Sequence, residues 1–331
     1  MERRRLGRTD IELSVVGLGT WVFGGRWGGA DDAESLAACH AALDAGVNWI
    51  DTADIYGQGR AERVIGQAVR DRRDEVVIAT KGGVAWELEP AFRIWREASA
   101  DYLRMSVDRS LQALGVDVID LYQVHWPVGG VPADETIGAL VELREAGKVR
   151  AIGVSNYHLP DLEATEGVAA IDSFQPGYHL FRREIEEGEL PWCGRNGVGV
   201  IAYGPLAHGL LTGKMSASQT FPATDWRAES ELFTDDAFPA RVEAVAELDA
   251  LAGECGRSGV AELAVAWVLR RPEVTAAIIG ARTPAQATAN AALAGRPLTA
   301  DEEAAIDAVL ARHPGVMGHY GHGEPPDPSA D

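Results

Sequence analysis

Four side chains whose types suit proton transfer stand at the ends of three apolar segments. Asp51 closes the first segment, and Tyr56 follows it in the sequence IDTADIYGQG. Lys81 comes directly after the second segment, and His125 ends the third. Taken singly, an Asp at a strand end commonly starts a loop, and a Tyr beside Gly commonly packs at a rim. Their recurrence at three segment ends instead indicates an active site at the carboxyl ends of parallel strands.

These four residue types suit the protonation of an oxygen atom. A free Tyr has a pKa near 10, so Tyr56 needs a neighbour that stabilises its phenolate. Lys81 would be that neighbour, and the Asp51 carboxylate would keep it charged and in place. A neutral His125 would donate a hydrogen bond to a substrate oxygen. This set can protonate a carbonyl oxygen during reduction, but it holds no hydride, so a cofactor has to supply one.

Short apolar segments alternate with amphipathic ones along most of the chain, which is typical of strand–helix units. We expect strands at 15–19, 47–51, 76–80, 118–125, 149–154, 171–175, 198–203 and 275–279. We expect helices at 32–45, 60–71, 99–114, 134–146, 241–255 and 259–271. This many units in one chain favour an α/β fold of the (β/α)8 TIM barrel type over an open doubly wound sheet.

Two further segments stand outside the barrel pattern. Residues 3–15, with the turn GRTD followed by the alternating segment 11–15, predict an N-terminal β-hairpin. Residues 204–238, after strand 7, form a connection too long for a plain link, and we interpret them as a lid. We expect one domain over residues 1–313 and a mobile tail over residues 314–331.

The composition restricts the partners and the compartment of the protein. Hydrophobic residues make up 46% of the 331 residues and charged residues 24%, which is typical of a globular protein with a large core. A net charge of −20 argues against nucleic acid and anionic membranes as partners. No signal-like apolar segment follows the first residues, and Cys39, Cys193 and Cys255 are scattered like free thiols. We therefore expect a cytoplasmic location.

The histidines and glycines indicate neither a metal site nor a Rossmann-type nucleotide site. His313, His319 and His322 lack acidic or Cys partners at ligand spacing, so we expect no metal. The sequence GLGTWV at 17–22 begins like a dinucleotide fingerprint, but Val22 stands where the third glycine belongs. A nicotinamide cofactor therefore needs a different kind of site.

Seven motifs, in order, resemble those of the aldo-keto reductase family. They are GLGTW at 17–21, IDTADIYG at 50–57, ATKGG at 79–83, DLYQVHWP at 120–127, KVRAIGVSN at 148–156, YGPLAHGLLTGK at 203–214 and IIGARTPAQATAN at 278–290. The similarity runs from about residue 3 to about residue 310 and is greatest to a bacterial branch with inositol-related and sugar-keto reductases. The resemblance implies NADPH-dependent reduction of an aldehyde or ketone, with NADH as the alternative cofactor.

The resemblance also implies roles for particular residues. Asp51, Tyr56, Lys81 and His125 would form the catalytic tetrad. The nicotinamide half of the cofactor would contact Gly19, Thr20, Trp21, Asp51, Ser155, Asn156, Gln175 and Tyr203. Its pyrophosphate would lie along Gly204, Pro205, Leu206, Gly209, Leu211 and Lys214. Its adenosine end would be held by Gly280, Arg282, Thr283, Gln286 and Asn290.

Within this last group, Arg282 suits a 2′-phosphate, because a guanidinium can bind phosphate with two parallel hydrogen bonds. Two positions depart from the family pattern. Ala289 replaces a Glu that often contacts the adenosine, and His179 replaces an Asn, which blurs the subfamily. We expect NADPH to be preferred.

The substrate opening should be lined by aromatic side chains, which also have a plain explanation as rim packing. The residues implied are Trp21, Trp86 and Trp126, together with Tyr178 and with Phe23 and Trp27 as neighbours. The partner would be a small carbonyl compound, and the oligomeric state, the substrate and the direction of the reaction stay open.

Two other functions are compatible with the residues. Lys81 at a barrel strand end could form a Schiff base, as in lyases of this fold. Alternatively, the chain could be a regulatory subunit that binds the cofactor and turns over slowly. The first leaves the cofactor motifs without a purpose, and the second lacks an appended partner segment at the amino terminus.

Overall fold

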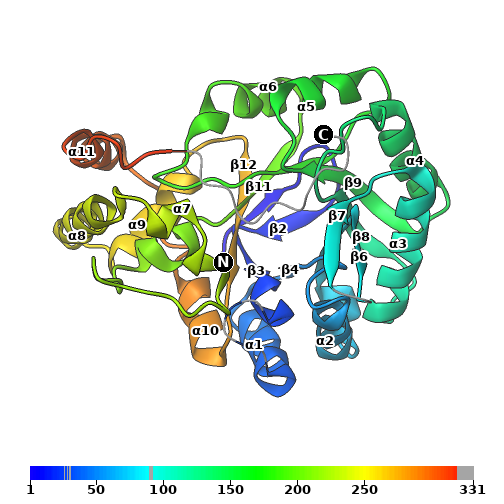
Figure 1. The fold of residues 1–331 in the computed structure, drawn as a ribbon, viewed down its shortest axis with the longest axis horizontal. Coiled ribbons are helices and arrows are strands. Elements are labelled where there is room, and N and C mark those ends of the chain that lie inside the picture. The colour runs from blue at the N-terminus through cyan, green and yellow to red at the C-terminus, as the bar shows by residue number, and fades with distance from the viewer. Residues whose placement is uncertain (26, 28, 30, 89–91, 319–331) are drawn as a thin grey trace.

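The computed structural model describes residues 1–25, 27, 29, 31–88 and 92–318. Its centre is a closed barrel of parallel strands, bonded in the order β3-β4-β5-β8-β9-β10-β11-β12 and closed between β12 and β3 (Figure 1). The strands are β3 (Val16–Gly19), β4 (Trp49–Asp51), β5 (Val77–Gly82), β8 (Ile119–Val124), β9 (Val149–Ser155), β10 (Ser173–Gln175), β11 (Gly199–Tyr203) and β12 (Val274–Gly280). Every barrel strand expected from the sequence is present, so the predicted (β/α)8 barrel is confirmed.

Helices surround the barrel and cover the outer faces of its strands (Figure 1). They are α1 (Asp32–Asp44), α2 (Arg60–Val69), α3 (Ala100–Leu114), α4 (Ala133–Glu145), α5 (Leu159–Glu166), α6 (Glu189–Asn196), α8 (Phe238–Glu254), α9 (Val260–Val268), α10 (Pro284–Ala292) and α11 (Ala300–Ala311). The predicted helices are present, but α5, α6, α10 and α11 are additional. Both α5 and α6 are too short for a clear apolar stripe and contain a Pro near the start, so their sequences do not indicate a helix.

A separate cluster of side chains fills the barrel interior. Trp49 is fully buried there, and its indole N–H donates to the Ser14 carbonyl at 2.9 Å. A Cβ atom at Gly17 would lie 2.1 Å from the Trp49 ring, so only glycine leaves room for the indole on the neighbouring strand. The interior is therefore a packed core and leaves function to the ends of the barrel.

The predicted N-terminal hairpin closes one end of the barrel. It consists of β1 (Arg3–Arg5) and β2 (Glu12–Ser14), which pair antiparallel. Leu6, Ile11 and Leu13 from this hairpin belong to the interior cluster, next to Trp49. Polar chemistry is thus restricted to the opposite end.

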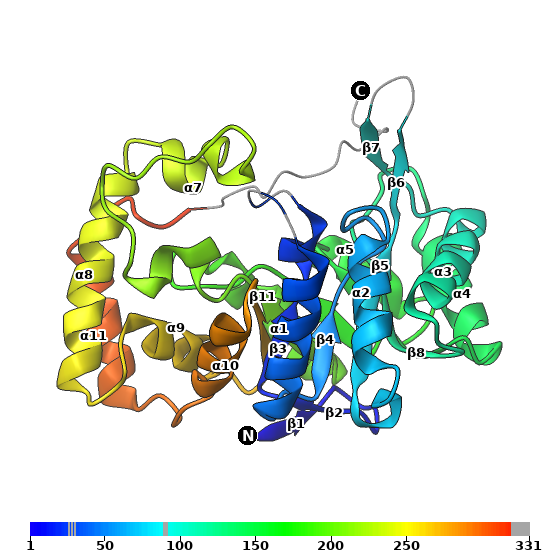
Figure 2. The same cartoon turned by 90° about the horizontal axis from the view of Figure 1, so that it is seen from below.

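Two segments project from that opposite end (Figure 2). One is a hairpin that the sequence analysis did not predict, formed by β6 (Val84–Glu87) and β7 (Arg93–Arg96). The other is the predicted long loop, which runs from the end of β11 to the start of α8 at Phe238. It contains the 3-10 turns η4 (Ala207–Thr212) and η5 (Trp226–Ala228) and the short helix α7 (Glu231–Thr234). Its role as a lid stays a prediction.

The end of the chain falls only partly within the described residues. Val316 is fully buried, and its carbonyl accepts a hydrogen bond from Arg241 Nε at 3.1 Å. His313 Nε2 lies 3.0 Å from Glu247 Oε1. The rest of the predicted tail, with His319 and His322, lies outside the described residues, and the division into a domain and a mobile tail stays a prediction.

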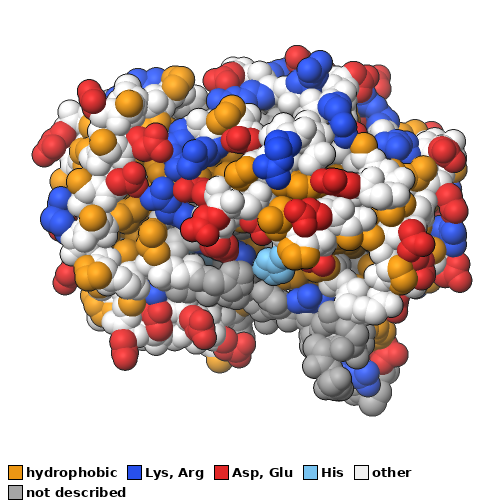
Figure 3. Space-filling model, turned by 90° about the horizontal axis from the view of Figure 1, so that it is seen from above, with side chains coloured by type: hydrophobic (Ala, Val, Ile, Leu, Met, Phe, Trp, Pro, Cys, Tyr) orange, Lys and Arg blue, Asp and Glu red, His pale blue; other side chains and the backbone are white. Residues whose placement is uncertain are grey.

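Charged side chains of both signs are interspersed on the face in Figure 3, so the excess of acidic residues does not form one continuous field there. Among the described residues, no helix is both long and apolar enough to cross a membrane.

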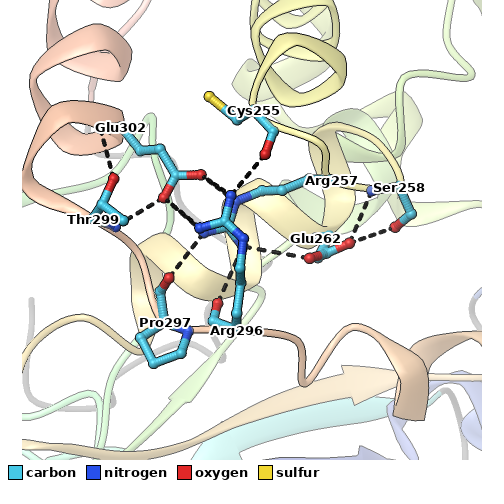
Figure 4. Close-up of polar contacts among 8 residues, drawn as sticks. All are labelled: Cys255, Arg257, Ser258, Glu262, Arg296, Pro297, Thr299 and Glu302. Atoms are coloured by element: carbon cyan, nitrogen blue, oxygen red, sulfur yellow. Dashed lines mark hydrogen bonds and ion pairs between the residues drawn. The ribbon is translucent and has the colours of Figure 1, made fainter.

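A buried ion pair lies outside the barrel interior, where α8 leads into α9 and meets α11 (Figure 4). Arg257 Nε donates to Glu302 Oε1 at 2.9 Å, and both side chains are almost fully buried. We call this cluster the helix junction; it comprises Cys255, Arg257, Ser258, Glu262, Arg296, Pro297, Thr299 and Glu302.

Candidate active site

The sequence-predicted chemical residues meet at the open end of the barrel, which we call the barrel mouth (Asp51, Tyr56, Lys81, His125 and Gln175). Asp51 is the last residue of β4, and Lys81 lies near the end of the adjacent β5. Gln175 ends β10, and His125 directly follows β8. Because parallel strands present their carboxyl ends at one edge, residues far apart in sequence converge here.

A buried ion pair forms the floor of the mouth. Lys81 Nζ donates to Asp51 Oδ1 at 2.7 Å and to the Thr52 carbonyl at 2.8 Å. Gln175 Nε2 donates to the other Asp51 oxygen, Oδ2, at 2.8 Å. The side chains of Lys81 and Asp51 are only 1% and 5% exposed, so this pair is held in a low-dielectric environment.

Tyr56 lies above this pair, in the turn between β4 and α2. The turn is held by hydrogen bonds from the Tyr56 N–H to the Ala53 carbonyl at 3.1 Å and from the Ala61 N–H to the Tyr56 carbonyl at 3.2 Å. Lys81 Nζ lies 5.3 Å from the centroid of the Tyr56 ring. The ring centroids of Tyr56 and His125 are 5.8 Å apart, at an interplanar angle of 76°. The phenol is thus close to both the ammonium and the imidazole.

His125 is fixed through its backbone and keeps one ring nitrogen without a partner. Its N–H donates to the Gly82 carbonyl at 2.8 Å, and its carbonyl accepts from Asn156 Nδ2 at 3.0 Å. Among the described residues, the buried Nδ1 has no hydrogen-bond partner. Burial, reinforced by the charge of Lys81, holds the pKa of His125 well below its usual range, so the ring is neutral at neutral pH.

The electrostatics of Tyr56 differ from the sequence-based expectation. We expected Lys81 to lower the pKa of the phenol. Burial raises the pKa of Tyr56 well above its usual range, and the charges of Asp51, Tyr203 and Asp54 add to this effect. The Lys81 charge is largely balanced by Asp51, so desolvation dominates. Tyr56 therefore carries its proton at neutral pH, as a proton donor must.

The ion pair itself is subject to two opposing influences. Burial raises the pKa of Asp51 and lowers the pKa of Lys81, because both charged forms lose solvation. Their mutual attraction and hydrogen bond oppose both shifts, and the Gln175 amide also supports the Asp51 carboxylate. With every oxygen of Asp51 bonded to a donor, the geometry favours the ionised pair.

The residues expected to hold the carboxamide form a connected network. Asn156, whose backbone is left-handed at φ 60°, donates from Nδ2 to Ser155 Oγ at 3.1 Å and accepts from Tyr203 OH at 2.8 Å. Ser155 Oγ donates to the Gln175 carbonyl at 2.8 Å. The network places these side chains beside Asp51, and most of their hydrogen-bonding groups already bind one another.

The segment expected along the pyrophosphate has an unusual backbone. Gly204, Ala207, His208 and Gly209 all have positive φ, at 67°, 45°, 55° and 101°. Positive φ costs energy at non-glycine residues and is typical of ligand-binding turns, whose clustered N–H groups can bind an anion. The side chains of Leu206 and Leu211 are buried. This segment therefore fits a phosphate group through its backbone.

At the expected adenosine end, the helix α10 begins with a capped first turn. Thr283 Oγ1 accepts from the Gln286 N–H at 3.2 Å, and Gln286 Oε1 accepts from the Arg282 N–H at 2.8 Å. Asn290 Nδ2 donates to the Gly280 carbonyl at 3.0 Å. The Arg282 guanidinium donates to the Trp27 carbonyl at 3.0 Å and is otherwise exposed. Arg282 is thus available to an anionic group at the surface.

Trp21 lies in an aromatic cluster that joins the long loop to the start of the chain. Its ring centroid is 5.2 Å from that of Trp27 and 5.0 Å from that of Trp226. Trp226 belongs to η5 of the long loop, and Arg227 lies over the Trp27 ring at 4.9 Å. Sequence reasoning did not assign Trp226 to the site, because no local signal links residues so far apart.

The other residues predicted to line the substrate opening are Trp126, Trp86 and Tyr178, and the structure places them in different environments. The Trp126 ring stacks beside His125 at 6.4 Å and is covered by the Arg96 guanidinium at 4.7 Å, so it lies at the mouth. Trp86 lies on the β6–β7 hairpin. The expectation for Tyr178 is wrong, because its side chain is fully buried on Trp267 and its hydroxyl bonds to Glu186 and Arg270.

Asp54 is a site-adjacent residue that sequence reasoning missed. Its buried carboxyl group accepts from Ser106 Oγ at 2.6 Å, and Ser106 in turn accepts from Tyr122 OH at 3.0 Å. Burial, then the nearby charge of Glu62, raises the pKa of Asp54 well above its usual range. The Asp54 carboxyl group thus ties the turn that carries Tyr56 to Ser106 on α3. Asp54 is part of the motif IDTADIYG, but nothing in the sequence distinguishes it from an ordinary Asp in a loop.

Fold and site together place the chain among the TIM-barrel oxidoreductases that use a nicotinamide cofactor. The family model described as "Aldo/keto reductase family" matches residues 15–311. The chain therefore belongs to the aldo/keto reductase family, and the resemblance found in the sequence is confirmed.

Two curated relatives illustrate this membership. The chain is 41% identical to the aldo-keto reductase YhdN of Bacillus subtilis, over 94% of this chain and 94% of that protein. It is 34% identical to an NADH-specific methylglyoxal reductase of Escherichia coli, over 88% of this chain and 93% of that protein.

Solved structures show the same fold at similar identity. A glycerol dehydrogenase from Gluconobacter oxydans is 40% identical with a TM-score of 0.87, covering 94% of this chain and 96% of that one. An aldo/keto reductase from Klebsiella pneumoniae, in complex with NADP and acetate, is 31% identical with a TM-score of 0.70, covering 93% and 94%.

Proposed function

We propose that the protein reduces the carbonyl group of a small aldehyde or ketone with a hydride from NADPH, or from NADH, and a proton from Tyr56. The observation that carries this proposal is the arrangement of Tyr56 over the buried Lys81–Asp51 pair and beside a neutral His125. Family membership supports the reaction type.

Each chain residue has a distinct task in this reaction. A bound reduced nicotinamide supplies the hydride to the carbonyl carbon. His125 donates a hydrogen bond to the carbonyl oxygen, which orients the substrate and stabilises the charge that develops there. Tyr56 transfers its proton to that oxygen, completing the alcohol. Lys81, held by Asp51 and the Thr52 carbonyl, stabilises the phenolate until it takes a proton from solvent.

The cofactor would lie across the barrel mouth toward α10. The Asp51, Ser155, Asn156, Gln175 and Tyr203 network would hold its nicotinamide end, together with Gly19, Thr20 and Trp21. The positive-φ residues Gly204, Ala207, His208 and Gly209 support a place for the pyrophosphate in this segment, with Leu211 and Lys214 following. Gly280, Arg282, Thr283, Gln286 and Asn290 would bind the adenosine end. A relative in complex with NADP supports this choice of cofactor, and an NADH-specific relative supports the alternative.

The substrate would enter between the aromatic residues Trp21, Trp86 and Trp126. Relatives named for methylglyoxal and for glycerol act on small oxygen-rich molecules. We therefore place sugar-derived and inositol-derived carbonyl compounds, together with small hydroxylated aldehydes, first among the candidates.

The test is Tyr56→Phe, measured as carbonyl-dependent oxidation of NADPH with a panel of such compounds. We expect kcat to fall roughly 10²- to 10⁴-fold, which is the usual contribution of a general acid, while NADPH still binds. The change deletes one hydroxyl group, so binding of NADPH reports an intact fold. Near-normal turnover by the Phe variant would show that another group donates the proton.

No observation favours the Schiff-base lyase. A lysine nucleophile has to be neutral and free, whereas Lys81 Nζ is bonded to a carboxylate at 2.7 Å and a carbonyl at 2.8 Å. Nothing in the geometry specifically supports a slow regulatory subunit either.

A further inference from the structure

A small pocket next to Arg282 brings acidic side chains close to the group expected to bind the 2′-phosphate. Its volume is about 210 Å³. The residues that line the pocket include Val22, Phe23, Asp31, Glu34, Ser35 and Arg282. Asp31, Glu34 and Ser35 come from the start of α1, which lies beside α10 (Figures 1 and 2). The wall that faces Arg282 is therefore built from the first turn of a helix.

This helix start already contains an anion of its own. Asp31 is the N-cap residue of α1, and its Oδ1 accepts from the Glu34 N–H at 2.9 Å. The amino end of a helix favours negative charge and commonly binds a phosphate. Here the Asp31 carboxylate occupies that position, and Glu34 adds a second charge in the same turn.

The carboxylates of the pocket are not neutralised by basic neighbours in the described part of the chain. Asp32, the third acidic residue of this turn, is paired with Arg60 at 2.7 Å. Asp31 and Glu34 form no such ion pair among the described residues, and both are exposed. Arg282 is the basic residue that shares their pocket.

Arg282 and these carboxylates act in opposite directions on the two cofactors. NADPH carries a phosphate of nearly two negative charges where NADH has a neutral hydroxyl group. A guanidinium attracts that phosphate, and a carboxylate repels it but can accept a hydrogen bond from the hydroxyl group. The same pocket therefore contains one group that favours NADPH and two that favour NADH.

We propose that Asp31 and Glu34 are specificity residues that weaken the binding of NADPH relative to NADH and so offset Arg282. This inference rests on the proposed function, since it needs the adenosine end of the cofactor at this pocket. It identifies the start of α1, outside every motif in the sequence, as part of the cofactor site.

The experiment measures dissociation constants for NADPH and NADH by quenching of Trp fluorescence, in the full chain without substrate. Asp31→Asn retains the capping ability of the side chain, and Glu34→Gln retains its shape. We expect each variant to bind NADPH about two- to fivefold more tightly, because each removes a repulsion of the size found between exposed charges. NADH binding should change by less than about twofold.

Two further variants sharpen the result. Arg282→Ala should move the NADPH dissociation constant in the other direction, upward by about tenfold or more, with little effect on NADH. Asp134→Asn makes the same charge change in the first turn of α4, well away from α1 and α10 (Figure 1). It should leave both constants unchanged, which separates a local effect from a change in net charge.

The outcomes distinguish this inference from the proposed function. If NADPH and NADH both bind but their ratio stays the same in Asp31→Asn and Glu34→Gln, the inference is wrong and the proposed function stands. The inference is also wrong if Asp134→Asn reproduces the shift. If neither cofactor binds to the unaltered protein, both proposals fail.

Discussion

Two buried ion pairs, one at the barrel mouth and one at the helix junction, use similar groups for different purposes. Lys81 and Asp51 meet at 2.7 Å at the mouth, and Arg257 and Glu302 meet at 2.9 Å at the junction. All four side chains are at most 6% exposed. Burial and pairing are therefore common to both regions and do not identify a functional site.

The regions differ in how completely their polar groups are satisfied. At the junction, each of the five N–H donors of Arg257 has an acceptor: both oxygens of Glu302, one oxygen of Glu262, and the carbonyls of Arg296 and Pro297 (Figure 4). Glu302 also accepts from Arg296 and from the Thr299 N–H. The Arg257 guanidinium therefore has no N–H left to bind a ligand.

The mouth leaves polar groups without partners beside its ion pair. Within the described residues, the buried His125 Nδ1, Thr52 Oγ1 and Gln123 Nε2 have none. Buried polar groups without partners are uncommon and need an explanation such as a bound ligand or a catalytic role. In this comparison, the unpartnered polar groups around the buried charges, rather than the charges themselves, distinguish the mouth from the junction.

Replacing Lys81 by Met tests the functional side of this comparison and should have the largest effect. The phenolate of Tyr56 loses its stabilising ammonium, so we expect kcat to fall roughly 10²- to 10⁴-fold. Asp51 can take up a proton, because burial already raises its pKa, and this limits the loss of stability. The measurement is steady-state turnover with NADPH, together with urea unfolding at the same pH.

Asp51→Asn provides the control for Lys81→Met. It retains an oxygen acceptor for Lys81 but removes the charge, so its loss of turnover should be smaller. A Lys81→Met variant with normal kcat would place the mouth pair in the same structural class as the junction pair.

Replacing Arg257 by Met tests the structural side. Glu302 and Glu262 lose a buried guanidinium, and we expect the free energy of unfolding to fall by about 3 kcal/mol, the low end for a broken buried pair, because Arg296 and Thr299 still bond to Glu302. The urea midpoint gives the loss, and kcat at 25 °C should not change. A large decrease of kcat without loss of stability would contradict the assignment of the junction as scaffold.

The location of the active site could be predicted from the sequence because the residues of the barrel mouth stand at the ends of predicted strands. Asp51, Lys81 and His125 each stand at a strand end, and closing the barrel brings strand ends together whatever lies between them. The ring separation of Tyr56 and His125 and the orphaned Nδ1 depend on packing between distant segments. No pattern in a single sequence contains that information.

The junction and the Tyr178 environment show the limits more clearly. Arg257 and Glu302 are 45 positions apart and carry no motif, so their pairing follows only from how α11 docks on α8. Tyr178 follows β10 like a site residue, but its side chain turns into the core, where it bonds to Glu186 and Arg270. Position after a strand predicts where a backbone lies, whereas the direction of the side chain depends on tertiary packing.

Acid should reduce the stability that the junction contributes, whereas the mouth differs because burial raises the pKa of its carboxyl group, Asp51. Hydrogen bonds from Arg257, and further bonds from Arg296, hold the pKa of Glu302 well below its usual range. Burial acts in the opposite direction but is outweighed. A carboxyl whose folded pKa is depressed stabilises the fold above its unfolded pKa of about 4.3, and this stabilisation is lost as pH falls further.

We therefore expect Glu302→Gln to lose about 1.5–3 kcal/mol of stability at pH 7, as for hydrogen bonds to charged groups. The difference from the unaltered protein should shrink below about pH 4, because the unfolded chain then binds a proton that the folded Glu302 does not. Urea unfolding from pH 7 to pH 3 measures this difference. A constant difference across the range would mean that shape, rather than charge, accounts for the role of Glu302.

The smallest expected effect concerns Thr299, the N-cap of α11. Thr299 Oγ1 accepts from the Glu302 N–H at 3.2 Å, and Glu302 Oε2 accepts from the Thr299 N–H at 2.8 Å, which is a capping box that also orients Glu302 toward Arg257. Thr299→Ala should cost about 1 kcal/mol, measured from the urea midpoint, with kcat unchanged. Thr299→Ser keeps the hydroxyl and should retain nearly all the stability. If the Ala and Ser variants were equally stable, the cap would contribute nothing, and the junction would depend on its ion pairs alone.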